Sequence, residues 1–217
     1  VKILAGAVVG EAGFGATAGP TGVIDIPQLG RNLGRSHPAP RIDLQDVRPE
    51  RSDVLFDPPD DLGEIDVARN LSYGAHERHV LDVHTHKSRS SDTLMPVIAY
   101  FHGGGFVRGD KDGNRNVADY FASLGLIGVN ATYRLAPEAK WPDGANDMGA
   151  AVAWIKANIA DFGGDPNQIF VVGKSAAAAH AATYVFRPDL LNTGTAAAAG
   201  VIMVSGTYDA DTSNPGE

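Results

Sequence analysis

The chain has 217 residues, of which 43% are hydrophobic and 20% charged, a composition typical of a globular protein with a buried core. Its formal net charge is −8 and no basic cluster stands out, which argues against a nucleic acid as partner. Because it contains no cysteine, disulfides, thiolate metal sites and a cysteine nucleophile are excluded.

Residues 1–62 are rich in glycine and proline and show little helical periodicity, which predicts an N-terminal arm lying on the rest of the chain. The apolar run after Lys2 has some features of a signal peptide, but Glu11 does not fit that interpretation. We therefore favour a cytoplasmic protein over a secreted or periplasmic one. No apolar run approaches the roughly 20 residues that a membrane span needs, so no membrane partner is expected.

From residue 63 onward the pattern changes to strands and helices. Residues 67–73 and 79–86 alternate as the two strands of a hairpin, with a turn at Gly74. Further strands are predicted at 96–101, 126–133, 169–172 and 200–204, and helices at 114–124, 143–159 and 176–186. Strands that alternate with helices of this length predict an α/β fold with a mainly parallel central sheet flanked by helices. Residues 63–217 are thus expected to form part of one α/β domain.

The strand at 169–172 leads directly into Gly173-Lys174-Ser175-Ala176-Ala177, and a helix is predicted to follow. This is the arrangement of a nucleophile elbow, G-x-S-x-G, except that Ala177 replaces the second glycine. Small residues beside the serine let strand and helix approach closely while the hydroxyl is exposed. By itself, a five-residue match of this kind more often belongs to an ordinary connection between a strand and a helix than to an active site.

The strand at 96–101 leads into His102-Gly103-Gly104-Gly105. Consecutive glycines lose much backbone entropy on folding, so they usually mark a place where the backbone approaches something closely. An oxyanion hole, in which backbone N–H groups stabilise a tetrahedral intermediate, is such a place. A flexible strand-to-helix loop is the alternative interpretation.

The two motifs occur in the expected order, each at the carboxyl end of a predicted strand, and together they are far more specific than either alone. With Tyr133-Arg134-Leu135-Ala136-Pro137-Glu138, and with Gly164-Asp165-Pro166 before the elbow strand, they make the chain resemble the bacterial hormone-sensitive-lipase-like carboxylesterases of the α/β-hydrolase superfamily. The resemblance covers residues 65–210 and implies the α/β-hydrolase fold.

The resemblance also implies roles for particular residues. Ser175 would be the nucleophile, and the N–H groups of Gly104, Gly105 and Ala176 would form the oxyanion hole. His102 would support the glycine loop rather than act as base. The implied reaction is hydrolysis of short-chain carboxylic esters through an acyl-enzyme on Ser175, with no cofactor and no metal. Arg134 and Glu138 are interpreted as structural residues that tie the connection after their strand.

The sequence departs from this family after the elbow. The family places its catalytic acid and histidine beyond later strands, and none of the histidines present lies in that region. His180 is expected to be a surface or packing residue of the helix, and Asp209 and Asp211 come too early for the acid. We therefore expect the C-terminal strands of the domain to be missing, which would leave 200–204 as an exposed edge strand.

This gap keeps a second function open, a non-catalytic small-molecule-binding protein or an inactive fragment of the same fold. The expected partners are a small-molecule ester substrate and either a second polypeptide carrying the missing strands or further copies of the chain. Two other interpretations are weaker. Gly173-Lys174-Ser175 is not a P-loop because Gln168 stands where that pattern needs glycine. His84 and His86 would share one strand face as in metal sites, but a solvated edge face is favoured.

Overall fold

The computed structural model describes residues 64–89, 93–192 and 198–206, together with the backbone of three two-residue strands. The arm predicted for residues 1–62 lies almost entirely outside the described residues, so the boundary after residue 62 stays a prediction. Within the described part, no helix combines the length and the apolar character needed to cross a bilayer.

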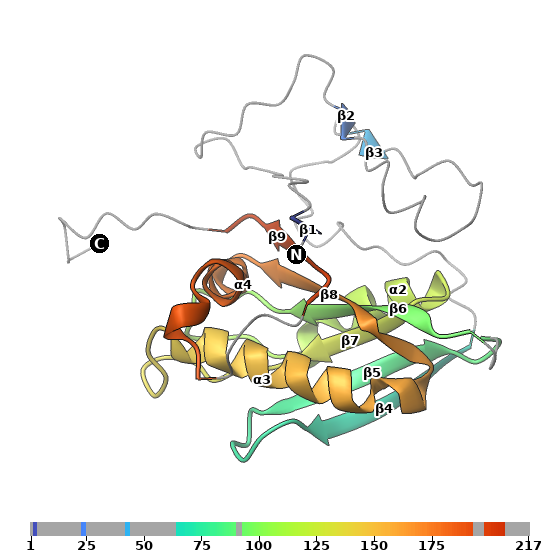
Figure 1. The fold of residues 1–217 in the computed structure, drawn as a ribbon, viewed down its shortest axis with the longest axis horizontal. Helices are drawn as coiled ribbons and strands as arrows, with labels where there is room; N and C mark the ends of the chain where they lie inside the picture. Colours follow the sequence, from blue (N-terminus) through green and yellow to red (C-terminus); the bar gives the residue numbers. More distant parts are fainter. Residues whose placement is uncertain are drawn as a thin grey trace.

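One sheet, with the strand order β1-β9-β8-β6-β7-β5-β4, organises the described residues (Figure 1). From β1 through β7 in this order each strand runs parallel to its neighbour, whereas β5 is antiparallel to both β7 and β4. The mainly parallel sheet predicted from the sequence is confirmed. The strands of this sheet are β1 (Lys2–Ile3), β4 (Ile65–Ser72), β5 (Val80–His86), β6 (Met95–Phe101), β7 (Ile127–Ala131), β8 (Gly164–Lys174) and β9 (Gly200–Val204). A separate antiparallel pair is formed by β2 (Val23–Ile24) and β3 (Ile42–Asp43).

Helices cover the sheet on two sides. The helix α2 (Arg115–Ser123) packs on β7, β5 and β6, whereas α3 (Asp143–Asn158) and α4 (Ala176–Phe186) pack on β8 and on each other. Figure 1 shows α3 crossing the face of the sheet turned towards the viewer. All three helices were predicted from the sequence with ends that agree within one residue. Three short 3₁₀ turns complete the described helical segments: η2 (Asp112–Asn114), η3 (Ile159–Phe162) and η4 (Pro188–Leu190).

The hydrophobic core is divided by the sheet into two unequal clusters. Successive side chains of a strand point to opposite faces, so Val97 and Ala99 of β6 belong to the larger cluster beneath α3 and α4. Ile98 and Tyr100 of the same strand belong to the smaller cluster, which is beneath α2. Strand β6 is therefore apolar on both faces, as expected of a central parallel strand.

Three expectations about strands need correction. His84 is fully buried, because its strand β5 lies between β7 and β4 rather than at a solvated edge. Gly164-Asp165-Pro166 does not merely precede the elbow strand but belongs to β8, since Gly164 pairs with Met95 of β6. Strand β9 is not the edge of the sheet, because the backbone of β1 pairs with it in parallel and supplies partners to its main chain.

Candidate active site

Ser175 stands between the end of β8 and the start of α4, in a backbone conformation that few residues adopt. Its φ is 53° and its ψ −118°, a strained combination for a residue with a side chain. The Ser175 N–H donates to the carbonyl of Val204 at 2.7 Å, which continues the ladder between β8 and β9 by one step. The chain then turns sharply into the helix, so that the half-buried serine sits at the tip of the turn. This is the geometry of a nucleophile elbow.

The residues on either side of Ser175 explain why the elbow forms. A Cβ atom at Gly173 would lie 2.4 Å from the carbonyl oxygen of Ala177, so only glycine lets the first turn of α4 pass so close to the strand. Ala177, in place of the second glycine of the motif, is fully buried. Its methyl group is accommodated, and the departure from the motif does not prevent the elbow.

The glycine loop lies directly beside the elbow. Phe101, the last residue of β6, is paired with Gly173 of β8, so the segments that follow both strands emerge at the same end of the sheet. A Cβ atom at Gly103 would lie 3.0 Å from the Cβ of Ser175 and 3.1 Å from the carbonyl oxygen of Lys174. Two motifs about 70 residues apart in the sequence thus come into contact.

The loop beyond Gly103 turns back on itself. Gly104 has a φ of +136° and Gly105 a φ of +61°, and the carbonyl of Gly104 accepts hydrogen bonds from the N–H groups of Val107 and Arg108. Among the described residues, the N–H groups of Gly104, Gly105 and Ala176 have no hydrogen-bond acceptor. The Ala176 N–H also belongs to the first turn of α4, where the helix dipole favours negative charge. These three donors remain available to an oxyanion.

His102 lies behind this loop rather than against Ser175. It is 1% exposed; its Nδ1 is 2.7 Å from the carbonyl oxygen of Gly103, and Tyr133 donates from its hydroxyl to the His102 carbonyl at 2.8 Å. The rings of His102 and Tyr133 are stacked with centroids 4.5 Å apart. Burial holds the pKa of His102 below its usual value, so the ring is neutral. The structure therefore places His102 where it can hold the loop.

His180 is a packing residue, one of the two alternatives expected for it. Its ring meets those of Phe106 and Tyr133 edge to face, with centroids 5.2 Å and 5.1 Å away, and rests against Gly144 of α3. Burial lowers its pKa to about 4. A Cβ atom at Gly144 would come within 2.4 Å of this ring, so the glycine makes room for it.

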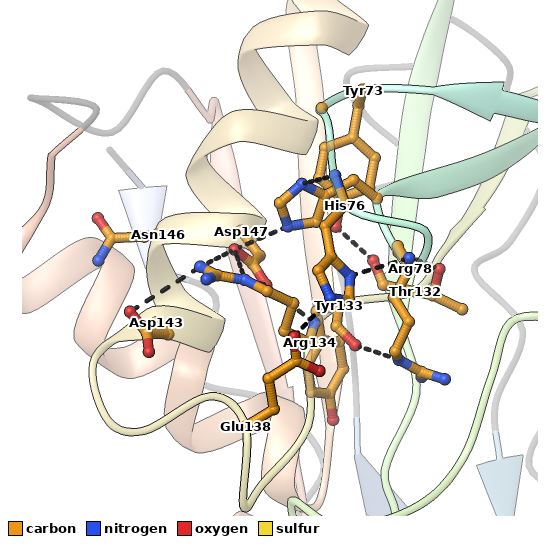
Figure 2. A network of polar contacts seen from close by, with 12 residues as sticks. Tyr73, His76, Arg78, Thr132, Tyr133, Arg134, Glu138, Asp143, Asn146 and Asp147 are labelled. Atoms are coloured by element: carbon orange, nitrogen blue, oxygen red, sulfur yellow. Dashed lines mark hydrogen bonds and ion pairs between the residues drawn. The ribbon is translucent and has the colours of Figure 1, made fainter.

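A network of charged and polar side chains connects the hairpin, the end of β7 and α3 (Figure 2). Arg134 binds Asp147 of α3 through its side chain, with Nη2 2.6 Å from Oδ1, and Glu138 binds His76 of the hairpin at 2.9 Å. Their interpretation as structural ties is confirmed. His79 also approaches Asp147, with its Nε2 3.1 Å from Oδ1.

Sequence reasoning missed the residues that the hairpin contributes to this network. Arg78 and His79 belong to the turn between β4 and β5, and they contact residues more than 50 positions away. No local motif surrounds them, so the sequence carried no signal for their position.

No base for Ser175 is found among the described residues, because no described histidine forms a hydrogen bond with its hydroxyl. Asp209 and Asp211 lie outside the described residues. The described part also holds no cluster of three or more potential metal ligands. His84, which the sequence suggests as a possible metal-binding pair with His86, instead forms a buried contact with Asp119, with its Nδ1 2.7 Å from Oδ1.

The order of the sheet, the elbow and the adjoining glycine loop define an α/β hydrolase. A family model described as the alpha/beta hydrolase fold matches residues 98–217, more than half of the chain, and the chain belongs to this family. The resemblance to hormone-sensitive-lipase-like esterases is also confirmed.

Several relatives carry esterase names. Carboxylesterase NlhH of Mycobacterium tuberculosis is 45% identical over 83 residues, which are 38% of this chain and 26% of that protein. The probable carboxylic ester hydrolase LipM of the same species is 36% identical over 109 residues, 49% of this chain and 25% of LipM. A hyperthermophilic esterase from the archaeon Pyrobaculum calidifontis superposes with a TM-score of 0.52 at 26% identity, covering 66% of this chain and 45% of that chain. The chain thus spans about a quarter of the length of these two curated relatives and less than half of that structure.

Proposed function

We propose that this chain carries the nucleophile and the oxyanion hole of a serine carboxylesterase. The observation that supports it most is the contact between the glycine loop and the elbow, with Gly103 packed against Ser175. A strained serine at the tip of an elbow, beside three backbone donors without acceptors, suits attack on a carbonyl carbon.

In the proposed mechanism, the Ser175 Oγ attacks the carbonyl carbon of the ester while its proton passes to a histidine base. The N–H groups of Gly104, Gly105 and Ala176 then stabilise the oxyanion; removing one such donor typically costs about 3–4 kcal/mol of transition-state stabilisation. The base returns the proton to the departing alcohol, which leaves an acyl group on Ser175. Water, deprotonated by the same base, hydrolyses this acyl-enzyme. The base and its acid would come from residues outside the described part or from another chain.

The first experiment is labelling with a fluorophosphonate probe, followed by peptide mapping. We expect the label at Ser175, and its loss in Ser175→Ala. Ser205→Ala is the matched control, because Ser205 also has a positive φ and directly follows Val204, whose carbonyl binds the Ser175 N–H. Labelling elsewhere, with Ser175 unmodified, would overturn the assignment of the nucleophile.

The substrate class is tested with para-nitrophenyl esters of increasing acyl length. We expect acetate and butyrate to be cleaved much faster than palmitate, an expectation that comes from the family resemblance. Equal or faster turnover of the palmitate ester contradicts the short-chain preference.

The alternative function is a protein that binds a small molecule in the same place without turning it over, and the observation behind it is that no described histidine forms a hydrogen bond with the Ser175 hydroxyl. Isothermal titration with a non-hydrolysable ester analogue separates the two functions when combined with the activity assay. Binding without hydrolysis, by a preparation whose intact mass and associated chains are known, supports the binding protein.

Native mass spectrometry of the same preparation tests the proposed second polypeptide or homo-oligomer, and cell fractionation tests the proposed cytoplasmic location.

A further inference from the structure

We propose that Arg78 is a positioning residue of the oxyanion hole, which fixes the tautomer of His102 and closes the base of the glycine loop so that the Gly104 N–H faces the elbow. The inference rests on the proposed esterase function and adds to it a residue from a distant part of the chain. Arg78 lies in the turn between β4 and β5, outside every motif that the sequence displays.

The Arg78 guanidinium joins three segments of the chain. Its Nε donates to the carbonyl of Tyr133 at 2.8 Å, just after β7, and its Nη2 donates to the carbonyl of Gly109 at 2.7 Å, where the glycine loop ends. The same Nη2 lies 3.5 Å from Nε2 of His102, where the loop begins. One planar group with several fixed donors therefore holds both ends of the loop against the end of β7.

The contacts of His102 determine which ring nitrogen carries the proton. A carbonyl oxygen only accepts hydrogen bonds, so the Nδ1 that lies 2.7 Å from the Gly103 oxygen must carry a hydrogen. Burial, aided by the nearby positive charge of Arg78, keeps the ring neutral by lowering its pKa. The Nε2 atom then has a free lone pair, and this lone pair faces the Arg78 N–H. Arg78 thus favours the tautomer in which His102 donates to Gly103.

The hydrogen bond from His102 orients the peptide group that joins Gly103 and Gly104. This peptide is trans, since the only cis peptides in the described part precede Pro137 and Pro142. In a trans peptide the C=O and the following N–H point in opposite directions. With the Gly103 carbonyl held towards His102, the Gly104 N–H points in the opposite direction within the peptide plane, away from the ring.

The end of the loop supports the same carbonyl. A Cβ atom at Gly109 would lie 2.5 Å from the Gly103 oxygen and 2.6 Å from Nδ1 of His102, so Gly109 packs directly on the hydrogen bond between them. Because Arg78 donates to the carbonyl of Gly109, it fixes the position of this part of the loop over the hydrogen bond. Without the guanidinium, both the tautomer of His102 and the packing over its hydrogen bond lose their support.

The decisive measurement is the ¹⁵N spectrum of the His102 imidazole in the full protein, assigned with a His102→Asn variant. In the wild type we expect a protonated Nδ1 and an unprotonated Nε2. In Arg78→Met we expect the Nε2 signal to shift towards the value of a mixed tautomer population. Arg78→Lys keeps a cation but cannot reach all three partners, so we expect an intermediate spectrum, and this variant decides the question if Arg78→Met does not fold.

The kinetic measurement separates positioning from folding. We expect Arg78→Met to lower kcat by about 10- to 100-fold with KM little changed, a smaller loss than the 10²–10³-fold typical of removing a donor outright. Arg115→Met is the control, because it removes another guanidinium with a polar partner, but Arg115 pairs with Asp119 within α2 rather than with the glycine loop. Ile155→Val shortens a buried side chain of α3; it should lower the thermal stability and leave kcat unchanged.

Two results would overturn the inference. The first is a His102 spectrum in Arg78→Met that equals that of the wild type. The second is a fall in kcat no larger than that of a control with the same loss of stability. If the wild type neither hydrolyses an ester nor reacts with the fluorophosphonate at Ser175, the proposed function fails, but the ¹⁵N spectra still decide whether Arg78 fixes His102.

Discussion

Gly104 and Gly105 are neighbours in the chain, yet a side chain would meet very different surroundings at the two positions. At Gly104 a Cβ atom would lie 1.9 Å from the carbonyl oxygen of Arg108, whereas at Gly105 no atom lies within 4 Å. Gly105 has the φ of the left-handed region, which L-residues adopt at a modest cost. Of these two neighbours, Gly104 is therefore the one that the packing of the loop requires to be glycine.

We expect Gly104→Ala to lower kcat by about 10²–10³-fold, because the loop must move and one oxyanion donor is displaced. Gly105→Ala should lower it by less than about tenfold, since its backbone can stay in place. Steady-state kinetics on a para-nitrophenyl ester measure both, with circular dichroism as the control for folding. An unchanged kcat in Gly104→Ala would mean that the loop is only a connector.

His180 makes the stability of the protein depend on pH. Burial lowers the pKa of His180 to about 4 from the usual 6.5 of a histidine, against a smaller opposing effect of Asp147. The unfolded chain takes up a proton near pH 6.5 and the folded protein only near pH 4. The stabilisation by the neutral ring is thus complete above pH 6.5 and is lost as the pH falls towards 4, in total on the order of 3 kcal/mol.

Urea unfolding between pH 7.5 and 4.5 tests this expectation. In His180→Gln, which has no titrating group at this position, the free energy of unfolding should fall less steeply over the same range. Part of the slope should remain, because burial also lowers the pKa of His102. Identical slopes in the two proteins would exclude His180 as the source.

At the scale of elements, Asp147 connects α3 to the end of β7 and to the hairpin. It is 2% exposed and accepts hydrogen bonds from the backbone and the side chain of Arg134, which is itself partly exposed. Removing one partner of a buried ion pair leaves the other without compensation. We expect Asp147→Asn to lower the free energy of unfolding by about 2–4 kcal/mol, a range that allows for the solvent around Arg134.

The control for Asp147 is Asp189→Asn, which breaks the exposed pair between Asp189 and Arg187. Pairs on the surface contribute little, so this variant should unfold at the same urea concentration as the wild type. If both variants behaved alike, the network in Figure 2 would not hold α3 in place.

The elements themselves were largely predictable from the sequence, because their signals are local. The helix at 176–186 follows from a run of small residues after a strand, and the end of β6 at Phe101 from the glycines that follow it. The approach of Gly103 to Ser175 could be expected only through the family resemblance. Arg78, His79 and Asp147 could not be predicted as a group, because their contacts join segments that are far apart in the sequence.

At the scale of the whole molecule, the strand order implies a gradient of protection across the sheet. Strand β6 lies between β7 and β8 with buried side chains on both faces, whereas β4 is an edge strand with several exposed residues. Local opening therefore costs far less at β4 than at β6. Which strands would be neighbours was not readable from the sequence, since β6 and β8 are separated by β7 and two helices along the chain.

Amide hydrogen exchange measures this gradient. We expect the amides of Ile98 and Ala99 in β6 to exchange at least about 100-fold more slowly than those of Arg69 and Asn70 in β4. Similar rates at both positions would show that the sheet opens as one unit.

The same strand order sets a delay during protein synthesis. Gly103 and Ser175 lie about 70 residues apart, so a ribosome that adds roughly 5–20 residues per second needs about 4–15 s between them. During this interval β6 can pair with β7, but its other edge has no partner until β8 emerges. An unpaired apolar edge is open to strands of other chains. Codons that slow translation between β7 and β8 would lengthen the interval in which two nascent chains can associate through β6.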